Sequence, residues 1–156
     1  MAVAWLAGRG DFLLSGIVLI PGFLLDAVDG AIARAMQRKD CFGQLLDSTL
    51  DRYSDGFIFG GLAYYFASQG QVNESLLAVA ALIGAFMVSY VRARAEGMGV
   101  GPIKEGLFDR SLRSIILVIA LLSGWVLPGL ALLAVGSHLT AIQRIVIGYR
   151  KTHLVP

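Results

Sequence analysis

The sequence predicts an all-α, polytopic bundle of membrane-spanning helices. Of its 156 residues, 56% are hydrophobic and only 15% are charged. An ordinary soluble domain carries roughly 25% charged residues. The mean hydropathy of +0.71 also favours a membrane protein. Long, nearly uncharged runs approach the roughly 20 residues that cross the hydrocarbon core of a bilayer. These runs are FLLSGIVLIPGFLL, SLLAVAALIGAFMVSYV, SIILVIALLSGWVL and PGLALLAVGSHLTAIQRIVI.

The apolar runs and the turns between them predict five complete membrane spans. The spans cover about residues 11–33, 43–67, 74–95, 110–124 and 129–149. Residues 1–8 resemble the end of a preceding span. We therefore expect a single domain over residues 1–156 that is truncated at its N-terminus. The 19 glycines and many alanines suit close contact between helices in lipid.

The cations lie almost entirely on one side of this predicted bundle. If successive helices alternate in direction, all but one of the 13 Lys and Arg residues fall at one membrane face. The exception is Arg9. Cytoplasmic loops carry an excess of Lys and Arg, so the crowded face is expected to be cytoplasmic in a cell membrane. The single cysteine, Cys41, excludes an internal disulfide.

Four aspartates gather at the inner ends of the first two predicted spans. Asp26 and Asp29 are three positions apart, and Asp47 and Asp51 are four apart, so each pair shares a helical face. Facing carboxylates repel unless cations lie among them. Mg²⁺ binds carboxylates and substrate phosphates, and two metals can clamp both oxygens of a phosphoryl transfer. The alternative is that the aspartates cap helices or pair with neighbouring arginines.

Residues 26–51 resemble the signature of the CDP-alcohol phosphatidyltransferase family, D-x2-D-G-x2-A-R-x8-G-x3-D-x3-D. The fixed positions are all present, as Asp26, Asp29, Gly30, Ala33, Arg34, Gly43, Asp47 and Asp51. The family consists of membrane enzymes, usually homodimers with a six-helix bundle. They transfer a phosphatidyl group from a CDP-linked lipid to an alcohol and release CMP.

The resemblance implies a role for each matched residue. The four aspartates would hold two ions of Mg²⁺ or Mn²⁺, and Asp51 would also be the general base on the acceptor hydroxyl. Gly30, Arg34 and Gly43 would lie against the CDP moiety. Asp40 departs from the family, because a small hydroxyl residue is expected there. The implied donor is CDP-diacylglycerol or an archaeal CDP-ether lipid, and no nucleic-acid partner is expected.

A second region, residues 89–114, indicates the acceptor. Arginines suit phosphate because their planar fork gives two parallel hydrogen bonds. The region resembles the phosphatidylinositol-phosphate synthase branch and its archaetidylinositol-phosphate relatives. Within this region the resemblance is carried by Tyr90, Arg92, Arg94, Glu96, Gly106, Asp109, Arg110 and Arg113, and the pair Gln143 and Arg144 of the last predicted span also matches it. In that branch basic residues bind the acceptor's phosphate, and these map to Arg92, Arg113 and Arg144. The alternative is that these cations contact lipid headgroups.

The sequence thus predicts a membrane enzyme of phospholipid biosynthesis, with inositol phosphate as the expected acceptor and glycerol phosphate as the alternative. Membrane lipids and a second copy of the chain are the expected partners. A cation transporter with a carboxylate-lined path is the rival from another class. It is disfavoured because the four aspartates map to one membrane face and none lies in a later span. A bundle that binds CDP-lipid but turns over slowly is a third possibility, since the first span looks incomplete.

Three further polar residues are assigned structural roles. His138 is expected to make a contact between helices, and Asp55 is expected to pair with a nearby arginine. Glu96 is expected to tether Arg92 or Arg113.

Overall fold

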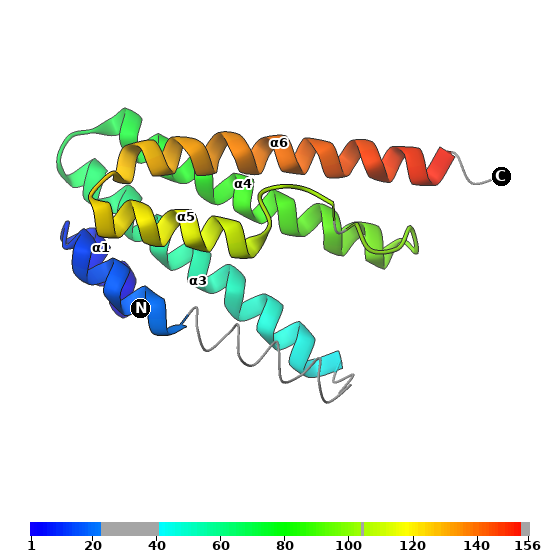
Figure 1. The fold of residues 1–156 in the computed structure, drawn as a ribbon, viewed down its shortest axis with the longest axis horizontal. Helices are drawn as coiled ribbons and strands as arrows, with labels where there is room; N and C mark the ends of the chain where they lie inside the picture. Colours follow the sequence, from blue (N-terminus) through cyan, green and yellow to red (C-terminus); the bar gives the residue numbers. More distant parts are fainter. Residues whose placement is uncertain (23–40, 104, 154–156) are drawn as a thin grey trace.

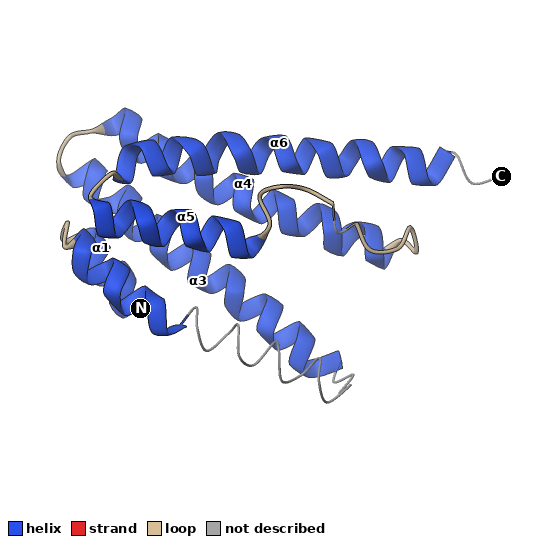
Figure 2. Cartoon of the chain, viewed as in Figure 1, coloured by secondary structure: helices blue, strands red, loops and turns tan. Residues whose placement is uncertain are grey.

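The protein is a bundle of α-helices in the computed structural model, which describes residues 1–22, 41–103 and 105–153. The helices are α1 (Ala2–Gly8), an unlabelled helix over Phe12–Gly22, α3 (Cys41–Ser68), α4 (Val72–Gly97), α5 (Arg110–Ser123) and α6 (Val126–His153). These described ranges contain no strand (Figure 2). The all-α prediction is confirmed, and α3 to α6 coincide with the four later apolar segments. The first segment is described only as far as residue 22.

Within the part of the chain that the structure describes, two helices, α4 and α6, are long and apolar enough to cross a membrane, with 26 and 28 residues. α3 also has 28 residues, but its first half carries polar side chains, including Asp47, Asp51 and Asp55. α5 has 14 residues. At the usual rise per residue, that length gives about 21 Å, less than the roughly 30 Å of a hydrocarbon core. Length and apolarity therefore single out α4 and α6 as the clearest membrane-crossing helices.

α4 lies at the centre of the bundle, packed between α3 and α6 (Figure 1). α5 packs along α6, and α1 packs against α3. Leu62, Ala81, Leu121 and Leu130 bring α3, α4, α5 and α6 together in one buried core. Figure 1 shows the N-terminal half of α3 diverging from α6. The start of α3 and the ends of α4 and α6 lie toward this same side of the bundle.

Small residues set the spacing between α4 and its neighbours. The buried face of α4 is made mainly of Ala78, Ala81, Gly84 and Ala85. A Cβ placed on Gly84 would lie 2.7 Å from His138 Nδ1 and 2.9 Å from Ser137 Cβ on α6. The expected helix–helix contact of His138 is thereby confirmed. Close approach through small residues, as predicted from the glycine and alanine content, brings α4 and α6 together.

We expect Gly61→Ala to weaken the packing of α1 on α3. A Cβ at Gly61 would lie 2.4 Å from the carbonyl oxygen of Ala4, a backbone atom that cannot rotate away. Overpacking typically costs about 1–3 kcal/mol, so the free energy of unfolding in detergent should fall by about that amount. Gly60→Ala is the matched control, because nothing lies within 4 Å of its Cβ. Equal stability of the two variants would contradict the close approach.

Candidate active site

The carboxylates of α3 occupy one face of its first half. Asp47, Asp51 and Asp55 follow one another at intervals of four residues, which places them on successive turns of the same face. Asp47 is exposed, Asp55 is half-buried, and Asp51 has only 7% of its surface exposed. The face therefore leads from solvent into the bundle, and Asp51 is its most enclosed carboxylate.

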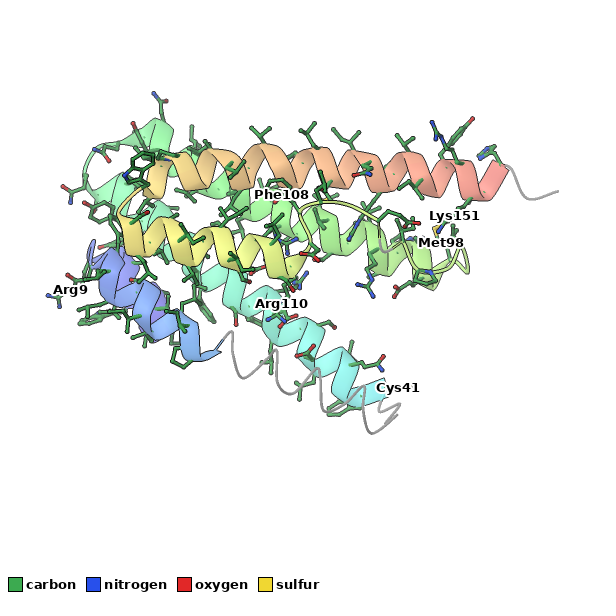
Figure 3. All side chains as sticks on the ribbon, viewed as in Figure 1. Arg9, Cys41, Met98, Phe108, Arg110 and Lys151 are labelled. Carbon is green, nitrogen blue, oxygen red and sulfur yellow. The ribbon has the colours of Figure 1, made fainter. Side chains whose placement is uncertain are left out.

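Two arginines of α5 meet the enclosed part of this face. Arg110 forms an ion pair with Asp51, and Figure 3 shows its side chain reaching from the start of α5 toward α3. Arg113 Nη2 lies 3.7 Å from Asp55 Oδ2, so the prediction that Asp55 pairs with an arginine is confirmed. Arg52 Nη2 also approaches Asp51 Oδ2, at 3.6 Å. The negative charge of Asp51 is thus met by cations from α5 and from its own helix.

The local structure at the start of α5 positions the side chains of Arg110 and Arg113. The carboxylate of Asp109 accepts a hydrogen bond from the backbone N–H of Leu112 at 2.9 Å, and so caps the helix. Arg110 and Arg113 are three positions apart and share a face. Arg113 is buried, and its Nη1 donates to the carbonyl oxygen of Phe108 at 3.0 Å. The cap and this hydrogen bond fix the point from which both side chains leave the backbone.

The other two candidate phosphate-binding arginines lie in different surroundings. Arg144 of α6 has 4% of its surface exposed. Its Nε donates to the carbonyl oxygen of Glu105 at 2.9 Å, and its Nη1 donates to that of Val88 at 2.7 Å. Arg92 of α4 is exposed, and its Nε donates to Glu96 Oε1 at 3.0 Å, as expected for Glu96. Arg144 therefore holds backbone groups together, whereas Arg92 faces solvent.

Part of the predicted metal and nucleotide site lies outside the described residues. The residues concerned are Asp26, Asp29, Gly30 and Arg34. Gly43 and Asp47 lie in the first two turns of α3. Among the residues that the structure describes, no group of three or more His, Cys, Asp or Glu side chains converges on one point. Asp47 and Asp51 still offer carboxylate oxygens on one face, the donors that hard divalent cations prefer. This donor pair fits such a cation, and its completion by Asp26 and Asp29 stays a prediction.

A groove of ≈ 780 Å³ lies between α3 and α4, lined in part by Arg52, Gly56, Phe57 and Phe86. On α3 the residues that line it are turned by about 100° or more from Asp51, given the helical rotation per residue, except Ser48, which is turned by about 60°. Arg52 donates from Nη1 to the hydroxyl of Ser89 across this groove. The groove and the carboxylate face thus lie on different sides of α3, and Arg52 contacts both.

Two contacts of the site were not anticipated from the sequence. From the sequence, Arg110 was only one of the residues that carry the family resemblance, and in the structure it forms an ion pair with Asp51. Thr140 of α6 accepts a hydrogen bond from the backbone N–H of Phe108 at 3.3 Å. The one sequence signal for Thr140 is its position four residues before Arg144, on the same face of the last helix.

The sequence model of the CDP-alcohol phosphatidyltransferase family matches residues 1–146, so the chain belongs to this family. It is therefore an enzyme of that class, and its apolar helices agree with a membrane protein.

The chain is also similar to two individual synthases in this family. The chain is 44% identical over 133 residues to an archaetidylinositol phosphate synthase of Pyrococcus horikoshii, covering 85% of this chain and 68% of the relative. It is 39% identical over 158 residues to a phosphatidylinositol phosphate synthase of Streptomyces avermitilis, covering 92% and 64%.

Solved structures of one synthase match the fold. The phosphatidylinositol phosphate synthase of Mycobacterium tuberculosis with CDP-DAG bound superposes with a TM-score of 0.87 at 29% identity, covering 99% of this chain and 83% of that one. The same synthase in complex with manganese and citrate gives a TM-score of 0.81 at 29% identity, covering 99% and 79%.

Proposed function

We propose that this chain, as a single domain, transfers the phosphatidyl or archaetidyl group of a CDP-linked lipid to inositol phosphate and releases CMP. The relatives it resembles make inositol-phosphate lipids of both kinds. The observation that carries the proposal is the enclosed Asp51 carboxylate, met by Arg110 at the start of α5. A carboxylate beside cations suits a reaction between a hydroxyl group and a phosphorylated donor.

Asp51 is proposed as the general base. The acceptor hydroxyl attacks the lipid-side phosphorus of the diphosphate, the bond from this phosphorus to the oxygen of CMP breaks, and the hydroxyl proton passes to the carboxylate. Arg110 and Arg52 hold the carboxylate in place from two helices. A positioned base of this kind contributes about 10²–10⁴-fold to the rate.

The four signature aspartates are proposed to hold two divalent cations, Mg²⁺ or Mn²⁺. These residues are Asp26, Asp29, Asp47 and Asp51. When bound, the cations supply positive charge that stabilises the diphosphate and the leaving CMP. The manganese in the Mycobacterium tuberculosis synthase supports this choice of ion. Gly30, Arg34 and Gly43 are proposed to lie against the CDP moiety, as the matched signature implies.

Arg92, Arg113 and Arg144 are proposed to form the cationic end of the site that receives the acceptor's phosphate. They come from α4, α5 and α6, so the three helices would enclose this phosphate together. The site is proposed to face the cytoplasm, because the cations of the sequence crowd that face. The family resemblance further supports a bundle of membrane-spanning helices and a homodimer.

The proposed function is tested by CMP release from CDP-diacylglycerol in the presence of Mg²⁺. Inositol 1-phosphate, glycerol 3-phosphate, inositol and serine are offered separately, and inositol 1-phosphate should give the highest kcat/KM. A chelator should stop the reaction, and added Mg²⁺ or Mn²⁺ should restore it. A CDP-ether lipid offered in parallel identifies the donor. If an acceptor without a phosphate is preferred, the acceptor assignment is wrong.

A further inference from the structure

One face of α6 supports the loop that joins α4 to α5, which is described over residues 98–103 and 105–109. The contacting residues recur every four positions, which keeps them on a single face. They are Gly136, Thr140, Arg144 and Gly148, and we call this face the loop seam. Their loop partners run in the opposite order along the chain, from Phe108 through Glu105 to Ile103. The loop therefore lies antiparallel along α6 over three turns.

Two polar side chains of the loop seam hold the loop backbone. Thr140 Oγ1 accepts from the N–H of Phe108 at 3.3 Å, and Arg144 Nε donates to the carbonyl oxygen of Glu105 at 2.9 Å. Arg144 Nη1 also donates to the carbonyl oxygen of Val88 on α4 at 2.7 Å. Thr140 and Arg144 are both buried, so water does not compete freely for these backbone groups.

Glycines on both sides allow the loop to approach α6 closely. A Cβ on Gly136 would lie 2.3 Å from ring atoms of Phe108, whose side chain lies beside α6 in Figure 3. Gly106 has a φ of +129°, which favours glycine, and its Cβ would lie 2.5 Å from Thr140 Cγ2. The backbone conformation of Gly106 and the short Cβ distances at Gly136 and Gly106 therefore both favour glycine where the loop packs against α6.

Thr140 contacts the C-terminal end of the loop, and this end continues into α5 and its arginines at the site. The carbonyl oxygen of Phe108 accepts from Arg113 Nη1 at 3.0 Å. Two residues later, Arg110 pairs with Asp51. A shift of Phe108 along α6 would therefore move both arginines relative to the carboxylates of α3.

We propose that Thr140 is a positioning residue, which acts through Phe108 to place Arg110 and Arg113 at the acceptor end of the site. Its hydroxyl does not contact substrate in this role. The catalytic consequence rests on the proposed function, whereas the effect of Thr140 on the loop does not depend on it.

The test compares Thr140→Val, which keeps the volume but removes the hydroxyl, with Thr140→Ser, which keeps the hydroxyl. Loss of one hydrogen bond should raise the KM for inositol phosphate about fivefold in Thr140→Val. The kcat and the KM for the CDP-lipid should change much less. Hydrogen exchange of the Phe108 amide should accelerate in Thr140→Val and return toward the wild-type rate in Thr140→Ser. Leu139→Val, on the exposed side of the same helix, is the control and should change neither quantity.

Unchanged exchange at Phe108 in Thr140→Val overturns the proposal, and so does faster exchange with an unchanged KM for the acceptor. If Thr140→Val does not fold, both measurements are repeated on Thr140→Ala, which also lacks the hydroxyl and has a smaller side chain. If the wild-type chain releases no CMP with any phosphorylated acceptor, the proposed function fails. The exchange of Phe108 in Thr140→Val still decides whether Thr140 holds the loop.

Discussion

Asp51→Asn is expected to lower the rate of CMP release by about 10²–10⁴-fold with every acceptor, the usual contribution of a general base. Asparagine keeps the shape of the side chain but cannot take up the hydroxyl proton. It also removes the charge that Arg110 and Arg52 meet. The rate is measured at saturating donor and acceptor, with Ser68→Ala, at the exposed far end of α3, as the control.

A titration with Mg²⁺ separates the two roles proposed for Asp51. If the residue served only as a metal ligand, a higher Mg²⁺ concentration should restore the rate of Asp51→Asn. If the residue is the base, the rate should stay low after the metal requirement has been met. A wild-type rate at ordinary Mg²⁺ concentration would contradict both roles.

Arg113→Ala is expected to destabilise the bundle by about 3–5 kcal/mol, the usual result of removing one partner of a buried ion pair. The side chains of Arg113 and Asp55 are only 6% and 19% exposed. The substitution leaves the Asp55 carboxylate without this cation and removes the hydrogen bond to the carbonyl oxygen of Phe108. The free energy of unfolding in detergent is the measured quantity.

A double-mutant cycle tests this interpretation. Asp55→Ala combined with Arg113→Ala should recover part of the lost stability, because no unpaired buried charge remains. Arg92→Ala is a stability control, since its exposed pair with Glu96 should contribute less than about 1 kcal/mol. If the single and double variants are equally unstable, the ion pair is not the cause of the loss.

The sequence predicted the elements well because their signals are local. Apolar runs bounded by polar turns gave segments that coincide with α3 to α6 to within a few residues. Four-residue spacing placed Asp47, Asp51 and Asp55 on one face, since helix geometry alone requires it. Asp55 was paired correctly with an arginine because an isolated charge in an apolar helix needs a partner.

The contacts between elements were harder to predict because they depend on how distant segments are placed. The pairing of Arg110 with Asp51 depends on where α5 begins relative to α3. Arg144 donates to backbone carbonyl groups, which every residue possesses, so no residue type marks its partners. The partner of Thr140 is likewise a loop amide 32 positions away. The roles of Asp26, Asp29, Gly30 and Arg34 stay predictions from the signature.

The buried face of α4 has a consequence for motion in the bundle. Alanine and glycine have no side-chain rotamers, so these residues of α4 offer no alternative packing as temperature or lipid composition changes. Where they set the contact, the separation of α4 from its neighbours changes only if whole helices tilt or slide. Thermal fluctuations of this kind are collective and slower than the flipping of single side chains. The bundle should therefore keep its width on the timescale of side-chain motion.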